Sequence, residues 1–285
     1  MQHILCLADI HGNVKAVKTL VKTLKTTFDL ILVAGDLLAT TIFPLMLQYI
    51  SSHFSLSRQE YANWVYKGAG RRAFEMYQLT TGREILNELK SIGKRIIFVP
   101  GNVDCQNVLD ILQKEYKTSI YILDGDLISF NSFSVSGIGG ALPFLSEKGI
   151  CDGEILERDF KQKRKLLESN KSPTNRFNVL ITHEAPAIPA LDNVIALSMC
   201  GSKELAKLLQ KSPYKLVITG HYHERPGFIR IKHTTYLNPG PLARYRFSVV
   251  SVHQNQVKVN LFRLQPPISD FTNFIYSLLE RNIIK

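Results

Sequence analysis

The segment ILCLADIHGN, residues 4–13, contains a change from strand to helix that is informative about the architecture. It starts with an apolar run of strand length, and from Val14 to Leu24 the apolar residues recur at the spacing of a helix. Two further runs of strand length occupy residues 30–34 and 95–99, and the second is followed by Pro100-Gly101. This order of strand, helix and strand with short polar connections predicts a βαβ core with parallel strands.

Five segments share one pattern, in which an apolar run ends in side chains that can bind a metal ion. They occupy residues 8–13, 34–36, 100–104, 181–184 and 219–223. Open α/β sheets bind ligands in the crevice beyond the carboxyl ends of their strands, so we expect these side chains to meet at one place. Asp9 and His11 lie two residues apart, as do His221 and His223, and in extended backbone each pair points to one side.

The ligand types in these segments indicate a transition-metal site. They are Asp, His and Asn without Cys, a mixture that suits Mn, Fe, Zn, Ni or Co better than Ca or Mg alone. A single Asp or His at a strand end is usually a cap or a turn former. Here, however, the segments contain four of the eight histidines of the chain, namely His11, His183, His221 and His223. The joint pattern therefore predicts metal binding.

Read in order along the chain, the motifs are D-x-H-G-N, G-D, G-N-x-D, a lone H and G-H-x-H, between residues 9 and 223. This set resembles that of the calcineurin-like metallophosphoesterase superfamily. The residues NPGP at 238–241 also resemble the Asn-Pro-Gly turn of its small phosphodiesterase-type members. The resemblance implies an α/β fold, a four-layer αββα sandwich in which two mixed β-sheets are flanked by helices, with the metal site at the carboxyl ends of the strands.

The resemblance further implies a binuclear metal centre with seven protein ligands. The cofactors would be two divalent ions, Mn in the first place and Fe, Zn, Ni or Co as alternatives, and a hydroxide between them would attack phosphorus in line. A bridging carboxylate agrees with this assignment, because it brings two ions to about 3.5–4 Å from each other. The first ion would be held by Asp9, His11 and His223, Asp36 would bridge, and the second ion would be held by Asn102, His183 and His221.

The chain departs from many members of the family at Val103, which stands where they have the histidine of G-N-H-D. That histidine is expected to protonate the leaving oxygen, and general acid catalysis contributes about 10²–10⁴-fold. His11 and Asp104 are the predicted catalytic residues in its place, with Glu184 as a further alternative. The substitution favours a phosphodiesterase over a monoesterase.

Three functions are compatible with these motifs. The favoured one is a metal-dependent phosphoric ester hydrolase that acts on a small molecule, with a phosphodiester as the preferred substrate. The second is a non-catalytic metal-binding scaffold for protein–protein interaction, and the third is a nuclease. A nucleic-acid partner rests only on the net charge of +11, which equally suits a solvated surface or an anionic small substrate.

Substrate contacts are predicted at Asn13 and Arg225. Asn13 follows the first metal motif and could meet a phosphate oxygen, or it could only cap the helix that begins at Val14. Arg225, Arg244 and Arg246 flank the last motifs and could clamp a phosphate group through paired hydrogen bonds.

The length of 285 residues and the hydrophobic content of 45% predict one domain over 1–285. Residues 38–92 are expected to contain a helical insertion, because they are too long for an ordinary connection, and 268–285 a helical tail. No apolar run is long enough to span a membrane, and the first residues lack the pattern of a signal peptide. Four scattered cysteines favour a reducing cytoplasm, and the sequence is compatible with a homo-oligomer.

Overall fold

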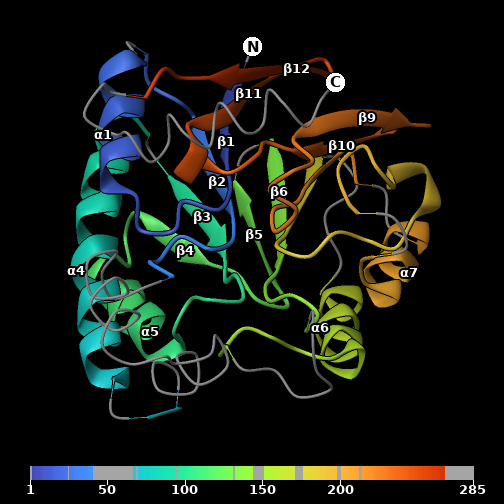
Figure 1. Ribbon diagram of the computed structural model, residues 1–285. Coiled ribbons are helices and arrows are strands. Elements are labelled where there is room, and N and C mark those ends of the chain that lie inside the picture. The colour runs from blue at the N-terminus through green and yellow to red at the C-terminus, as the bar shows by residue number, and fades with distance from the viewer. Residues whose placement is uncertain are drawn as a thin grey trace, which may run out of the picture.

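Two six-stranded β-sheets pack face to face and carry helices on their outer sides (Figure 1). The structure is a computed structural model that describes residues 2–266 other than 25, 41–66, 69, 94, 131, 144–150, 171–175, 198–199 and 212–213. The first sheet has the strand order β12-β11-β1-β2-β3-β4, and the second has the order β5-β6-β7-β8-β10-β9.

The strands of the first sheet come from both ends of the described chain. They are β1 (Gln2–Leu7), β2 (Leu30–Ala34), β3 (Ile96–Val99), β4 (Ile120–Ile122), β11 (Arg246–His253) and β12 (Gln256–Arg263). The first four run parallel to one another, whereas β11 is antiparallel to β1 and β12 is antiparallel to β11. The N-terminal strand β1 therefore lies in the interior of a mixed sheet.

The second sheet is formed by the middle of the chain. Its strands are β5 (Asp126–Phe130), β6 (Phe133–Ile138), β7 (Phe177–Thr182), β8 (Leu216–Ile218), β9 (Gly227–Ile231) and β10 (Thr234–Asn238). Strands β6, β7, β8 and β10 are parallel, and the edge strands β5 and β9 are antiparallel to their neighbours. Both sheets are thus mixed, with parallel strands at their centres.

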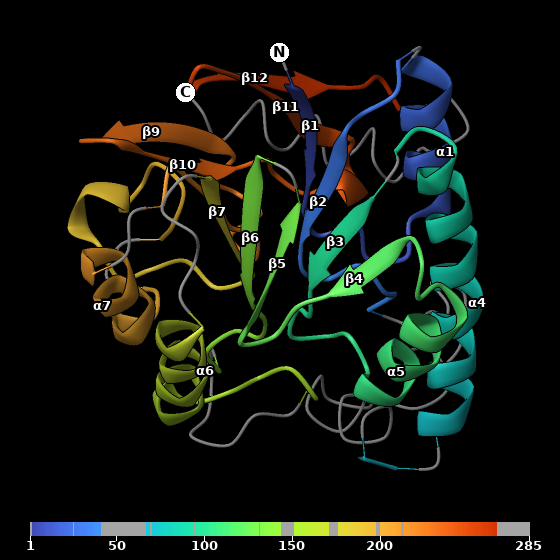
Figure 2. The same ribbon diagram turned by 180° about the vertical axis from the view of Figure 1, so that it is seen from behind.

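The helices cover the outer face of each sheet (Figures 1 and 2). Helices α1 (Val14–Thr23), α4 (Arg71–Lys90) and α5 (Gln106–Glu115) pack on the first sheet. On the second sheet lie α6 (Glu157–Ser169) and α7 (Lys203–Lys211). The layers are therefore helix, sheet, sheet and helix, and this confirms the four-layer αββα sandwich.

Alternation along β1 shows why the core has more than one layer. Leu5 and Leu7 pack with the helices α1, α4 and α5, whereas Ile4 and Cys6 pack between the two sheets. Successive side chains of a strand point to opposite faces, so a strand that is covered on both faces is apolar at every position. This explains the uninterrupted apolar runs that end at the polar motifs.

Helix α4 lies within the segment 38–92, where the sequence predicts a helical insertion. Residues 41–66 of that segment, and the predicted tail 268–285, are outside the described residues. None of the helices in the described part of the chain has the length and apolar character needed to cross a membrane.

Candidate metal centre

The predicted ligands follow the carboxyl ends of five strands from both sheets. Asp9, Asp36 and Asn102 come after β1, β2 and β3 of the first sheet. His183 comes after β7, and the pair at 221 and 223 comes after β8, in the second sheet. Because β1 to β3 are parallel, and β7 and β8 are parallel, the ligands of each sheet leave it at one edge.

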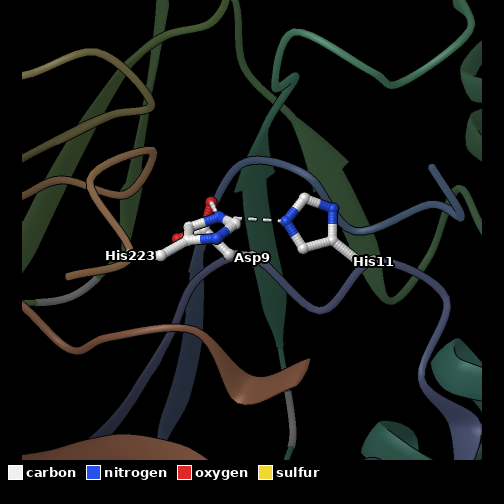
Figure 3. A group of neighbouring side chains, drawn as sticks. All are labelled: Asp9, His11 and His223. Carbon is white, nitrogen blue, oxygen red and sulfur yellow. Dashed lines mark hydrogen bonds and ion pairs between the residues drawn. The ribbon is translucent and has the colours of Figure 1, made fainter. Parts of the chain in front are cut away.

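A first group of potential ligand atoms comes from Asp9, His11 and His223, which all lie within 4.8 Å of one another. The Nε2 atoms of His11 and His223 are 3.0 Å apart, and His223 Nε2 is 3.2 Å from Asp9 Oδ1. Figure 3 shows the two rings facing each other with the Asp9 side chain beside His223. These are the three residues that the resemblance assigns to the first ion.

A second group comes from Asp9, Asp36 and His183, whose ligand atoms also lie within 4.8 Å of one another. His183 Nε2 is 3.4 Å from Asp36 Oδ2 and 2.9 Å from Asn102 Oδ1. The Nδ1 atom on the other side of the His183 ring is 2.8 Å from the carbonyl of Ala34. A hydrogen bond from Nδ1 to a carbonyl leaves Nε2 as the atom that can bind a cation.

His221 enters the centre in two ways. Its ring lies edge-to-face against the ring of His183, with 5.1 Å between the centroids. Its backbone N–H donates to Asp9 Oδ1 at 3.1 Å, which ties the loop after β8 to the loop after β1. The structure thus brings all seven predicted ligands to one edge of the sandwich.

Two buried atoms support the fit of these residues to metal ions. Asp9 Oδ2 and His11 Nδ1 have no hydrogen-bond partner among the described residues, although almost no buried polar atom is left unpaired in folded proteins. The paired Nε2 atoms of His11 and His223 both offer lone pairs to the space between them when each neutral ring carries its proton on Nδ1. A cation would satisfy Asp9 Oδ2 and the two Nε2 atoms, and the donor set of Asp, His and Asn has the chemistry for it.

The backbone of the centre is strained where the ligands are attached. Asp9, His11, Asp36 and His221 have φ angles of 51°, 49°, 51° and 66°, in the left-handed region. Asp and His visit this region more readily than most residues, but each such position costs about 1–3 kcal/mol. Strain of this kind is found mainly at functional sites, where the surrounding structure holds it in place.

Gly35 and Gly101 let the ligand loops approach one another. A Cβ atom on Gly35 would lie 2.2 Å from Nδ1 of His183, and one on Gly101 would lie 1.9 Å from Oδ1 of Asp36. Gly35 also has a φ angle of 84°. The glycines of the G-D and G-N motifs are therefore required by packing inside the centre.

The carboxylates of Asp9 and Asp36 raise the pKa of two of the ligand histidines, whereas burial lowers the pKa of His11 and His221. Burial would lower the pKa of His183, but the Asp36 carboxylate raises it to about 10. Burial would also lower the pKa of His223, but the Asp9 carboxylate raises it, and the pKa is raised overall. In return, the nearby histidines hold the pKa of Asp36 below its usual range in spite of its burial. The centre thus attracts positive charge.

A buried hydrogen bond between Glu184 and Tyr222 links the two histidine loops. Each of these residues directly follows a predicted ligand, and the Tyr222 hydroxyl donates to Glu184 Oε1 at 2.6 Å. Glu184 Oε2 accepts from the backbone N–H of Leu142 at 2.9 Å, and Asn238 donates to the Tyr222 carbonyl at 3.0 Å. The sequence gives no signal for this pairing, because the two residues are far apart in the chain.

Gln78 of α4 is a second supporting residue that the motifs do not reveal. Its side chain is fully buried and donates to the carbonyls of Ala39 and Val103, while its Oε1 accepts from the N–H of Cys105. It therefore holds the loop after β3 against the helix. Nothing local in the sequence distinguishes Gln78 from the surface residues of this charged, amphipathic helix.

The remaining predicted site residues have partners inside the protein. Asn13 Oδ1 accepts from the Ala16 N–H and caps α1, and its Nδ2 donates to the carbonyl of Ala243. Asp104 is 2% exposed, and its two carboxylate oxygens accept from the N–H groups of Gly101 and Leu38. Val103 is buried, and its N–H donates to Asp36 Oδ1.

Arg225 lies in the loop directly after the last ligand and is partly buried. Its N–H donates to the Tyr222 carbonyl at 3.0 Å, and its Nε is buried without a hydrogen-bond partner in the described part of the chain. Arg225 is close to the last ligand, His223, in the sequence. Among the described residues, however, no polar contact links its guanidinium to a predicted ligand.

Comparison with known proteins identifies both a family and a fold. The family model of the calcineurin-like phosphoesterases matches residues 2–225. One crystal structure covers 92% of this chain and 99% of its own chain at a TM-score of 0.66 and 17% identity. The crystal structure of TT1561 from Thermus thermophilus covers 91% of this chain and 98% of its own, with a TM-score of 0.59 and 14% identity. No curated protein matches the sequence. At these identities the two structures are similar in fold alone.

Proposed function

The chain belongs to the calcineurin-like phosphoesterase family, and from that premise we propose that it hydrolyses phosphodiester bonds at a centre of two divalent metal ions. The observation that carries the proposal is the position of the Asp36 carboxylate. Its Oδ2 atom lies 3.9 Å from His11 Nε2 and 3.4 Å from His183 Nε2, so it faces both groups of ligands. A carboxylate shared in this way is what a two-metal centre requires.

The metal ligands would be divided between the two ions as the resemblance implies. Asp9, His11 and His223 would hold one ion, Asp36 would be shared, and Asn102, His183 and His221 would hold the other. Bound ions of this kind supply Lewis acidity at the phosphoryl oxygens and activate water for attack on phosphorus. The protein contributes orientation, because the bond from His183 Nδ1 to Ala34 and that from Val103 N–H to Asp36 fix two ligands before binding.

Proton transfer is proposed at His11 and Asp104, in place of the histidine that Val103 replaces. Burial and the Asp36 charge raise the pKa of Asp104 to about 6, so it takes up a proton at a pH just below neutral. Both of its oxygens, however, accept backbone N–H groups. Asp104 would therefore act mainly by holding together the loops after β2 and β3. A diester with a good leaving group is the substrate that depends least on a general acid.

The proposed ligand of the centre is a small phosphate ester, with Asn13 and Arg225 as contacts at its rim. We propose Mn as the metal, as the resemblance implies, with Fe, Zn, Ni and Co as alternatives that suit the same donor set. A cytoplasmic location is proposed because the four cysteines are scattered along the sequence and form no CxxC pair. A nucleic-acid partner and a homo-oligomer have no support beyond the net charge and the fold.

The decisive experiment is hydrolysis of a chromogenic bis-aryl phosphate and of its mono-aryl counterpart. The protein is first stripped of metal with a chelator, and Mn, Ni, Co, Zn or Mg is then added back. We expect cleavage of the diester, faster than that of the monoester, with a transition metal. Asp36→Asn is expected to abolish it, because the shared ligand is lost.

Asp29→Asn is the matched control, since Asp29 precedes β2 while Asp36 follows the same strand. The Asp29 carboxylate accepts the N–H of His3 and lies at the opposite end of the sheet from the centre. This variant should keep its activity. Absence of turnover with every metal, on protein shown to bind two ions, would overturn the enzyme and leave the scaffold function.

A further inference from the structure

The segment after β10 docks on the loop that carries the first ligand. The N–H groups of Leu242 and Ala243 donate to the carbonyls of Ala8 and Asp9 at 2.9 and 3.1 Å. The Asn13 side chain completes the contact by donating to the Ala243 carbonyl at 3.1 Å. The next residue, Arg244, ends this short 3₁₀ helix, so its backbone is held at the rim of the proposed centre.

The Arg244 side chain reaches from that segment to the loop of the last ligand. Its guanidinium lies 3.3 Å from the carboxylate of Glu224, the residue directly after His223. Arg244 thus spans two ligand loops at the rim.

The pair of Arg244 and Glu224 is suited to exchange with a ligand. The arginine side chain is 25% exposed, so most of it is held by packing, whereas the glutamate side chain is 62% exposed. Ion pairs with an exposed partner contribute little to stability, because solvent screens them and a flexible side chain must be ordered. An anionic group of a ligand can therefore replace Glu224 without loss to the fold.

The two neighbouring arginines are less suited to this role. The Nε atoms of Arg225 and Arg246 are buried, and side-chain carbons of Arg246 pack close to Gly240. Arg244 is the member of the three whose guanidinium meets an exposed carboxylate beside a predicted ligand. Arginine binds a phosphate group through two parallel hydrogen bonds, which gives orientation as well as affinity.

We propose that Arg244 binds a second anionic group of the substrate, separate from the phosphoryl group that is taken at the metal centre. The inference rests on the proposed function and names its substrate class: phosphate esters that carry at least one further phosphate or carboxylate. Glu224 occupies the guanidinium until the ligand arrives. The net charge of +11 favours the approach of such polyanions.

The test is calorimetric titration of the Mn-loaded chain with adenosine 3′,5′-bisphosphate and with adenosine monophosphate. We expect the wild type to bind the bisphosphate about 10-fold more tightly or better, the range of a charge-assisted hydrogen bond. Arg244→Ala should remove that preference and leave the affinity for the monophosphate within about 2-fold. Arg83→Ala is the matched control, because Arg83 also pairs with a glutamate, Glu115, but on the helices α4 and α5.

Glu224→Gln tests the same site from the other side. The exposed change removes the competing carboxylate without touching the fold, so the bisphosphate should bind more tightly than to the wild type. No preference in the wild type, or an Arg244→Ala effect that is equal for the two ligands, would overturn the proposal. Because binding is measured, this result is independent of whether the chain hydrolyses any ester.

Discussion

At the scale of single residues, the seven ligands depend on neighbours that hold no metal themselves. Glu184 and Tyr222 stand beside ligand histidines in both loops of the second sheet, and both are buried. Residues that orient metal ligands commonly change metal affinity by about 10–100-fold when they are replaced. The bond between these two side chains is therefore expected to set how well His183 and His221 are placed.

Tyr222→Phe removes the hydroxyl that donates to Glu184 and keeps the packed ring. We expect the affinity for the ion at His183 and His221 to fall about 10-fold, since both loops lose a common anchor. Competition with a chelating dye measures it. Tyr214→Phe removes a buried tyrosine hydroxyl bonded to Ser136, at the opposite end of β8, and should leave metal affinity unchanged. Equal affinity in Tyr222→Phe and wild type would show that the bond has no role in the centre.

The stability of the metal-free protein is expected to fall as the pH rises from about 6.5 to about 10. Burial lowers the pKa of His183, but Asp36 raises it to about 10, above the usual 6.5. In this window the folded state keeps a proton that the unfolded state has lost. The protonated His183 therefore adds its full contribution to the free energy of unfolding below the window, and that contribution is lost as the pH rises through it. Urea unfolding of chelated protein at several pH values measures the trend.

The same proton links metal binding to pH. An ion must displace it from His183, so metal affinity should increase with pH across that window and binding should release protons into the buffer. Asp36→Asn removes the charge that holds the proton and should flatten the stability profile. A profile that stays steep in Asp36→Asn would assign the proton to another group.

At the scale of elements, the strand-end loops are the part of the site that the sequence predicts well. A buried parallel strand is apolar at every position, so the first polar residues after it mark its carboxyl end, as at Asp9 and Asp36. Supporting contacts are not visible in this way. Gln78 and Glu184 are fixed by partners that only the tertiary structure brings near, and nothing local in the sequence distinguishes them from surface residues.

Gly101→Ala is expected to destroy the centre while the two sheets remain folded. The added Cβ would lie 1.9 Å from Oδ1 and 2.2 Å from the backbone N of Asp36, so the loop after β3 must move away from that after β2. Overpacking of this kind costs about 1–3 kcal/mol, and metal binding should be lost. Metal content after dialysis and far-ultraviolet circular dichroism give the two results.

Gly82→Ala is the control for that variant. Its Cβ would meet only the ends of the Leu38 and Leu112 side chains, which can shift, and alanine is the better helix former inside α4. Metal binding should therefore persist. If Gly101→Ala retained both ions, the close packing of the two loops would not be needed for the site.

At the scale of the whole molecule, bound ions would join the two sheets. Asp9, Asp36 and Asn102 belong to the first sheet, and the histidines at 183, 221 and 223 to the second. A ligand that binds only the folded state stabilises it by about 2.7 kcal/mol at one hundred times its dissociation constant. Removal of metal by a chelator should therefore lower the melting temperature by roughly 5 °C or more.

Differential scanning calorimetry with and without chelator measures the shift. In Asp36→Asn, which lacks the shared ligand, the chelator should have almost no effect on the melting temperature. A wild-type protein whose melting temperature is insensitive to chelator, although it contains two ions, would mean that the ions do not connect the sheets.

The sequence predicts the layers of the fold better than it predicts the order of the strands in each sheet. The apolar runs give most of the parallel strands, and the resemblance gives four layers. The position of β11 beside β1 could not be derived, because pairing between strands some 240 residues apart is fixed by the closure of the whole sheet. Within 38–92 the described residues form the helix α4, and whether the segment is an inserted helical subdomain remains a prediction.

The place of β1 between β2 and β11 has a consequence for biosynthesis. During synthesis β1 leaves the ribosome about 240 residues before β11, and the ligands appear from Asp9 to His223. At about 5–20 residues per second, roughly 10–40 s separate the first ligand from the last. During that time one edge of β1 has no partner strand and is open to wrong pairing, which is where a nascent chain of this kind would need protection by a chaperone. The full set of metal ligands would therefore be complete only after His223 has been synthesised.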